Sequence, residues 1–182
     1  AGADAEAVEG VMLKRRDERY GVGRTKSAGP WWPWPVAPMT VDAVLVYAQR
    51  GHGRRASLYS DYTFAVWTDD AEGRRLVPFA KAYSGLTDAE IAGLTRHFLE
   101  RTIETRGRYR VVVPDTVIEV AFDSIRPSAR HQSGFALRFP RIARLRPDKT
   151  PAEIDTLDTC RRLAGDGAVP AAGRAGPRAG AR

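Results

Sequence analysis

The sequence predicts a mainly β protein whose strands close into a small barrel. Its central part reads as three strands, one helix and three further strands. Five or so antiparallel strands with one intervening helix are typical of the five-stranded OB-fold barrel. A two-sheet sandwich is the main alternative, because strand periodicity does not distinguish a closed barrel from two packed sheets.

The strands are indicated by runs of β-branched and aromatic residues between breaks that contain glycine or proline. A short first strand is expected at 8–14, and residues 15–38, polar and then rich in Gly, Trp and Pro, are expected to be irregular. The later strands are expected at 41–49, 57–67, 76–84, 108–113, 117–125 and 135–145. Pro78 indicates an edge strand or a bulge, because proline cannot donate to a ladder.

Two helices are expected beside these strands. The first covers 87–106, where Thr87 and Glu90 have the spacing of a capping box. Its apolar stripe, at a spacing of three to four residues, consists of Ile91, Leu94, Phe98 and Leu99. The second helix begins after Thr150, with Pro151 at its first position and Glu153 completing a second capping box, and continues toward residue 165. Residues 163–182, rich in Gly, Ala, Pro and Arg, are expected to be a disordered basic tail.

Composition narrows the classes of partner. The chain has 182 residues and a net charge of +7, which favours a polyanion such as nucleic acid, although a GC-rich genome that encodes Arg freely would give the same balance. The single Cys160 excludes an intramolecular disulfide and fits a reducing, cytoplasmic location. No apolar run is long enough to span a bilayer, and the acidic, Ala-rich start is not a secretory signal. The first residue is not Met, so the chain is expected to be processed or a piece of something longer.

Candidate functional residues are mostly basic. The stretch 138–149 carries five cations with one acidic residue, and arginine is suited to gripping phosphate oxygens. The glycine-broken loop 50–55 joins two barrel strands, a place where OB folds commonly contact nucleic acid. Further positive charge comes from Arg106, Arg108, Arg110, Arg126, Arg130 and His131. The alternative interpretation is a set of solvated strands and turns, and the aromatic residues of 57–67 are expected to be core rather than base-stacking residues.

Four blocks of the sequence carry a resemblance. They are EGVMLK, then YGVGRTK with a Trp-rich string, then VDAVLVYAQRGHGRRASLYSDYTFAVW, then RHQSGFALRFPRIARLRPDK. In this order they resemble the C-terminal part of bacterial ATP-dependent DNA ligases, most closely the cisplatin damage response type. The resemblance implies three regions. Residues 1–37 would be a remnant of the adenylation (nucleotidyltransferase) domain, 38–162 the OB-fold ligase C-terminal domain with a final helix, and 163–182 the tail.

The resemblance also implies roles for individual residues. RLRPDK matches nucleotidyltransferase motif VI, so Arg146, Asp148 and Lys149 would orient the pyrophosphate leaving group of ATP during enzyme adenylation. EGVMLK matches motif IV, so Glu9 would help to bind the catalytic Mg²⁺. Nucleotide-binding roles are implied for Lys14, Arg24, Lys26, Arg138 and Arg144. DNA-binding roles are expected for Arg50, Arg54, Arg55, Arg130 and His131, with nicked duplex DNA as the partner and no membrane contact.

Three departures from the family pattern qualify the expected activity. Where the family has a string like WWKWK, this chain has WWPWP, so Pro33 and Pro35 replace two lysines that contact the nucleotide α-phosphate. Ala37 stands in place of an acidic residue. No K-x-D-G string, which holds the lysine that attacks ATP, is present in the 182 residues. The chain alone is therefore expected not to adenylate itself and to depend on a missing N-terminal ligase half.

Two other functions remain open from the sequence. One is a stand-alone OB module that binds nucleic acid without catalysis. The other is a remnant of a capping-type nucleotidyltransferase that acts on RNA.

Overall fold

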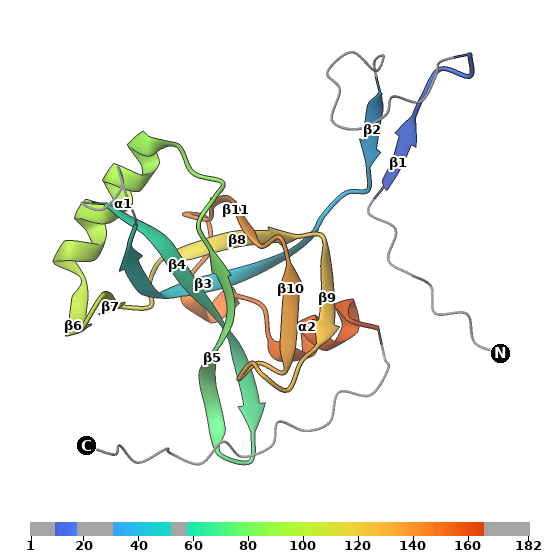
Figure 1. Ribbon diagram of the computed structural model, residues 1–182. Helices are drawn as coiled ribbons and strands as arrows, with labels where there is room; N and C mark the ends of the chain where they lie inside the picture. Colours follow the sequence, from blue (N-terminus) through green and yellow to red (C-terminus); the bar gives the residue numbers. More distant parts are fainter. Residues whose placement is uncertain (1–9, 18–30, 52–57, 166–182) are drawn as a thin grey trace, which may run out of the picture. The chain divides into compact units, whose positions relative to one another are not determined.

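The computed structural model describes residues 10–17, 31–51 and 58–165 (Figure 1). The chain divides into two compact units, Ala1–Pro38 and Met39–Arg182, and each unit is described by itself. The predicted tail lies outside the described residues from position 166 onward.

In the first unit, β1 (Gly10–Leu13) pairs with β2 (Trp32–Pro35) in an antiparallel two-stranded sheet. The expectation that 15–38 is irregular is therefore wrong for β2. Pro33 and Pro35 are two residues apart, so both positions without an N–H lie on the same side of the strand, and the other side can pair with β1. Trp31, Trp32 and Trp34 are exposed.

The main sheet of the second unit follows the order β11-β8-β3-β4-β5. The central strand β3 (Met39–Arg50) lies between β4 (Tyr59–Asp70) and β8 (Val117–Phe122). At the two ends of the path are β5 (Gly73–Ala82) and β11 (Arg141–Leu145), and every pairing along it is antiparallel.

The two end strands of this path approach each other. The amide of Ile142 in β11 donates to the carbonyl of Ser84, just beyond β5, at 2.9 Å. Gly85 makes the approach possible: its φ is +105°, and a Cβ there would lie 1.9 Å from the carbonyl oxygen of Ile142. The sheet thus curves into the barrel-like arrangement predicted for an OB fold. The register also shifts beside Pro78, which confirms the predicted bulge.

Four shorter strands complete the unit. A hairpin of β6 (Thr102–Arg106) and β7 (Tyr109–Val112) extends from the far end of β3, where β7 pairs with Tyr47, Ala48 and Gln49. A separate two-stranded sheet joins β9 (Ser124–Pro127) to β10 (Phe135–Arg138). The expected strands 117–125 and 135–145 are therefore each divided in two. Asp123 separates the first pair, and Phe139–Pro140, where Phe139 has a φ of 49°, separates the second.

The helices are shorter than the sequence suggested. The predicted capping box is present at the start of α1 (Asp88–Glu100), where Glu90 N donates to the Thr87 hydroxyl. The helix ends at Glu100, because the β-branched segment that follows pairs with β7 instead. Ile91, Leu94 and Phe98 are buried, whereas Leu99, expected in the apolar stripe, is exposed.

The second predicted helix is also divided. A 3₁₀ turn, η2 (Pro151–Glu153), precedes α2 (Leu157–Leu163), and Ile154 between them is extended. The expected capping box of Thr150 and Glu153 is present on η2. No helix in the described residues is long and apolar enough to cross a membrane.

The core fills the interior of the curved sheet beneath α1. Its largest fully buried side chains include Tyr62, Phe64, Phe98, Phe122 and Phe135. Tyr59, Tyr62 and Phe64 are buried and Trp67 is half-buried, with Nε1 donating to the Pro151 carbonyl at 2.7 Å, so the aromatic residues of 57–67 are confirmed as packing residues.

Candidate functional site

The three residues predicted to be catalytic lie just after β11 and are brought together by Asp42, near the start of β3. Arg146 Nη1 donates to both carboxylate oxygens of Asp42, at 2.9 and 3.0 Å. Lys149 Nζ donates to Asp42 Oδ2. Asp148 binds Arg146 from the other side, 2.9 Å from Nε and 2.7 Å from Nη2. Two cations and two carboxylates thus form one cluster.

Asp42 is the fixed member of this cluster. It is 7% exposed, its backbone N donates to Asp155 Oδ2 at 2.8 Å, and its carbonyl accepts from Asp155 N at 2.9 Å. Sequence reasoning missed Asp42, and the only signal was a carboxylate within an otherwise apolar strand, VDAVLV. A buried carboxylate needs a cationic partner or several hydrogen bonds.

The charges of the cluster reinforce one another. A hydrogen bond from Arg146 is the main reason that the pKa of Asp148 is lowered to about 2, despite a smaller opposing effect of desolvation. The hydrogen bond to Asp148, followed by the charges of Asp42, Asp148 and Glu119, raises the pKa of Arg146 above its usual value. Because each cation faces a carboxylate, the cluster is close to neutral overall.

The remaining residues predicted to bind nucleotide are dispersed. Arg144 pairs with Glu119, whose carboxylate lies 3.9 Å from Arg146 Nη1, so Arg144 belongs to the edge of the cluster. Arg138, on β10, stacks against Phe139 with its Cζ 5.1 Å from the ring centre. Lys14 belongs to the first unit, with its Nζ 4.0 Å from the ring centre of Trp31. Glu9, Arg24, Lys26, Arg54 and Arg55 lie outside the described residues.

A cavity of about 490 Å³ adjoins the cluster, between α1 and residues 145–149. Arg146 and Lys149 line it from one side and Glu90 and His97 from α1. His97 Nε2 lies 3.1 Å from the hydroxyl of Thr116, a second polar contact inside the same hollow. The cluster therefore borders a space large enough for a small ligand group.

A second surface joins the predicted DNA-binding residues Arg50 and His131. Three neighbouring cavities of about 280, 320 and 370 Å³ run across the outer sides of β7, β3, β4 and β5. Tyr109 lines both the first and second, and Thr63 and Lys81 line both the second and third. We call this surface the basic groove. Its further cations are Lys81, Arg106, Arg108 and Arg110, and exposed Arg130 precedes His131 in the chain. Lys81 pairs with Asp61, and Arg106 pairs with Glu104.

Comparison with known proteins gives these sites a context. The family described as the ATP dependent DNA ligase C terminal region matches residues 55–149. The chain belongs to this family.

Two individual relatives agree with this family assignment. A probable DNA ligase of Opitutus terrae is 59% identical over 94% of this chain, and one of Koribacter versatilis is 44% identical over 90%. The chain spans only 17% and 27% of the lengths of these two proteins. The ligase domain of LigD from M. tuberculosis has a similar fold, with a TM-score of 0.54 and 23% identity, over 81% of this chain and 47% of that one.

The family implies ATP and a divalent metal, and the described residues differ in how well they fit each. Guanidinium and ammonium groups facing a cavity fit a phosphate of ATP. No group of three or more His, Cys, Asp or Glu side chains that could hold a metal occurs among the described residues, and Glu9 is not one of them. In the described part of this ligase C-terminal region, two cations therefore border a cavity, and no cluster of three metal-ligating side chains accompanies them.

Proposed function

We propose that this chain is the C-terminal part of an ATP-dependent DNA ligase that seals nicks through enzyme–AMP and DNA–adenylate. In this assignment, 1–37 is the end of the adenylation domain and 38–162 is the OB-fold domain. The observation that supports the proposal is the convergence of Arg146 and Lys149 on the single buried carboxylate of Asp42, beside a cavity. Such a pair is suited to neutralising the charge of a leaving pyrophosphate.

The two carboxylates have different parts in this proposal. The side chain of Asp42 is 9% exposed and that of Asp148 58%. A phosphate can therefore displace Asp148 from the outer edge of Arg146 while Asp42 keeps the guanidinium in place. The planar guanidinium then offers its freed N–H groups to two phosphate oxygens, and Lys149 adds a point charge.

The covalent step is assigned to a lysine outside these 182 residues, because the chain contains no K-x-D-G string. Pro33 and Pro35 of β2 offer no cation where the family pattern has lysines, and each lost charge-assisted contact corresponds to about 1.5–3 kcal/mol. A bound Mg²⁺ would add charge neutralisation at the phosphates. The chain's own contribution is to bind and orient those phosphates.

Reconstitution tests this assignment. The Opitutus terrae relative, truncated to remove the region that matches this chain, would be mixed with the chain and with ATP labelled in its α-phosphate. We expect label on the truncated relative only when the chain is present, with R146M and K149M reducing it and R96Q, a control on the exposed face of α1, leaving it unchanged. Label on the chain by itself, or on the relative regardless of the chain, would contradict the proposal.

A stand-alone nucleic-acid-binding module is the second candidate, and the basic groove favours it. Its cations and the rings of Tyr47 and Tyr109 are the elements that contact backbone and bases in OB-fold proteins. This candidate predicts salt-dependent binding to nicked duplex without any stimulation of adenylation in the reconstituted mixture. The two assays together separate the candidates.

A further inference from the structure

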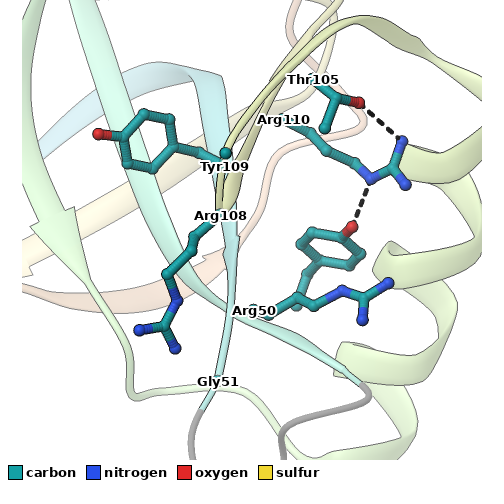
Figure 2. A pocket seen from close by; sticks show the side chains of 8 residues that line it. Arg50, Gly51, Thr105, Arg108, Tyr109 and Arg110 are labelled. Atoms are coloured by element: carbon teal, nitrogen blue, oxygen red, sulfur yellow. Dashed lines mark hydrogen bonds between the residues drawn. The ribbon is translucent and has the colours of Figure 1, made fainter.

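The positive charge of the second unit is not compensated equally everywhere. The first cavity of the basic groove lies where the end of β3 meets the β6–β7 hairpin (Figure 2), and we call it the arginine cavity. Its lining includes Arg50, Tyr59, Thr105, Arg108, Tyr109 and Arg110. No acidic residue is in that lining, in contrast to the cluster at Arg146.

Arg110 is held in the arginine cavity by hydroxyl groups. Its Nε donates to the Tyr59 hydroxyl, and its Nη1 donates to the Thr105 hydroxyl at 3.4 Å (Figure 2). Nη1 also lies 3.4 Å from the hydroxyl of Thr102. Neutral acceptors position a guanidinium without cancelling its charge. Among the described residues, no carboxylate forms an ion pair with either Arg50 or Arg110.

Tyr59 organises both arginines. Its ring centre lies 5.7 Å from Cζ of Arg50 and 5.5 Å from Cζ of Arg110. Tyr59 is 3% exposed, and its backbone N donates to the Thr95 hydroxyl at 3.3 Å. Desolvation tends to raise the pKa of Tyr59, but the hydrogen bonds and charges of Arg50 and Arg110 outweigh it, so the pKa is lowered. The two cations are therefore fixed around a buried ring before any ligand arrives.

We propose that the arginine cavity binds a phosphodiester phosphate of a polynucleotide backbone, an inference that rests on the DNA-binding part of the proposed function. An uncompensated, pre-positioned guanidinium is suited to phosphate oxygens. A backbone phosphate fits better than a free anion, because the arginine cavity shares Tyr109 with a second cavity, and that one shares Lys81 with a third that His131 lines, a row that suits a longer ligand.

This site is separate from the one at Arg146. Asp42 and Arg50 stand eight positions apart on β3, a path of at most about 26 Å along a regular extended strand, which the register shifts within β3 shorten. A polynucleotide held at the arginine cavity would therefore be anchored well away from the predicted pyrophosphate contacts. The two sites can accordingly be impaired one at a time.

The salt dependence of binding to a nicked duplex tests the inference with the full 182-residue chain. R110Q should weaken binding and lower the slope of log affinity against log salt by about 1, as expected for the loss of one phosphate-contacting cation. R110K should keep the slope but bind more weakly, because lysine lacks the guanidinium fork. R96Q removes the same charge from α1 and should leave both quantities unchanged. If R110Q does not fold, R50Q replaces it, because Arg50 lines the same cavity from the exposed end of β3.

Each outcome decides one question. If wild type shows no salt-dependent binding to the duplex, the DNA-binding function itself fails. If wild type binds but R110Q and R50Q have the slope of R96Q, the function stands and the arginine cavity is rejected. In a parallel arm, inorganic phosphate is titrated while the Arg110 Nε–H resonance is followed by NMR. A response there without any change in the duplex slope would identify a free-anion site and overturn the backbone assignment.

Discussion

Replacing Asp42 by Asn tests the centre of the candidate site. The substitution keeps the volume of the side chain and removes its charge. Arg146 Nη1 then loses a partner that accepts at 2.9 and 3.0 Å, and Lys149 loses its own. The new amide nitrogen of Asn also places N–H donors opposite those of Arg146 and Lys149, because Arg and Lys side chains have no acceptor.

The expected magnitude follows from burial. Removing one partner of a buried ion pair costs about 3–5 kcal/mol. The lower end applies here, because Asp148 still binds Arg146 and the side chain of Lys149 is 31% exposed. We therefore expect D42N to lower the free energy of unfolding by about 3 kcal/mol, or the Tm by about 10 °C for a domain of this size.

Urea and thermal unfolding followed by circular dichroism measure this effect. D158N is a matched control, because Asp158 is 71% exposed and pairs with Arg161 on the surface of α2, so its loss should be below about 1 kcal/mol. The effect of D42N should shrink in an R146M background, where the main cation is already absent. A loss for D42N no larger than that for D158N would refute the idea that Asp42 holds the site together.

Three further outcomes can be measured. G85A should lower the free energy of urea unfolding by about 3 kcal/mol or more, because Gly85 has a positive φ and a Cβ there would clash with Ile142. G73A should lower it by only about 1–2 kcal/mol, because Gly73 has a φ of +100° but open space around it. Equal losses would show that the ends of the sheet do not meet at Gly85. The pKa of Asp148 is lowered from 3.8 to about 2, so its ion pair with Arg146 stabilises the fold above pH 4. The difference in free energy of unfolding between wild type and D148N should therefore disappear as the pH falls from 4 to 2. A difference that persists at pH 2 would show that the ion pair is not its cause. Burial raises the pKa of Cys160 to about 12, so a thiol reagent at pH 8 should label it only as fast as the protein unfolds. Rapid labelling of the native protein would be inconsistent with the buried position of this thiol.

Local signals predicted much of the secondary structure. The strand runs, the bulge at Pro78 and the capping boxes at Thr87 and Thr150 depend on neighbouring residues, and the structure confirms them. The errors occurred where a distant partner decided the outcome. Residues 102–106 left the predicted helix because β7 was available to pair with them, and Trp32–Pro35 became a strand because β1 lay opposite.

The candidate site shows the same division. Arg146, Asp148 and Lys149 were predicted as a group from a resemblance, and the structure does bring them together. The predicted stripe of positive charge along 138–149 is largely paired, however: Arg141 contacts Asp123, and Arg144 contacts Glu119. These carboxylates come from other strands and loops, so their positions could not be inferred from the basic stretch.

By itself, the amino-acid sequence determined most of the strands, the starts of the helices and which cations are available to meet phosphate, because propensity, capping and motif spacing act over a few residues. Only the tertiary structure decided which of those cations are neutralised. Arg146 meets a carboxylate 104 positions away, while the partners of Arg110 in the described part of the chain are hydroxyls and the ring of Tyr59. That difference arises from strand register and barrel curvature, which bring side chains together across the whole chain.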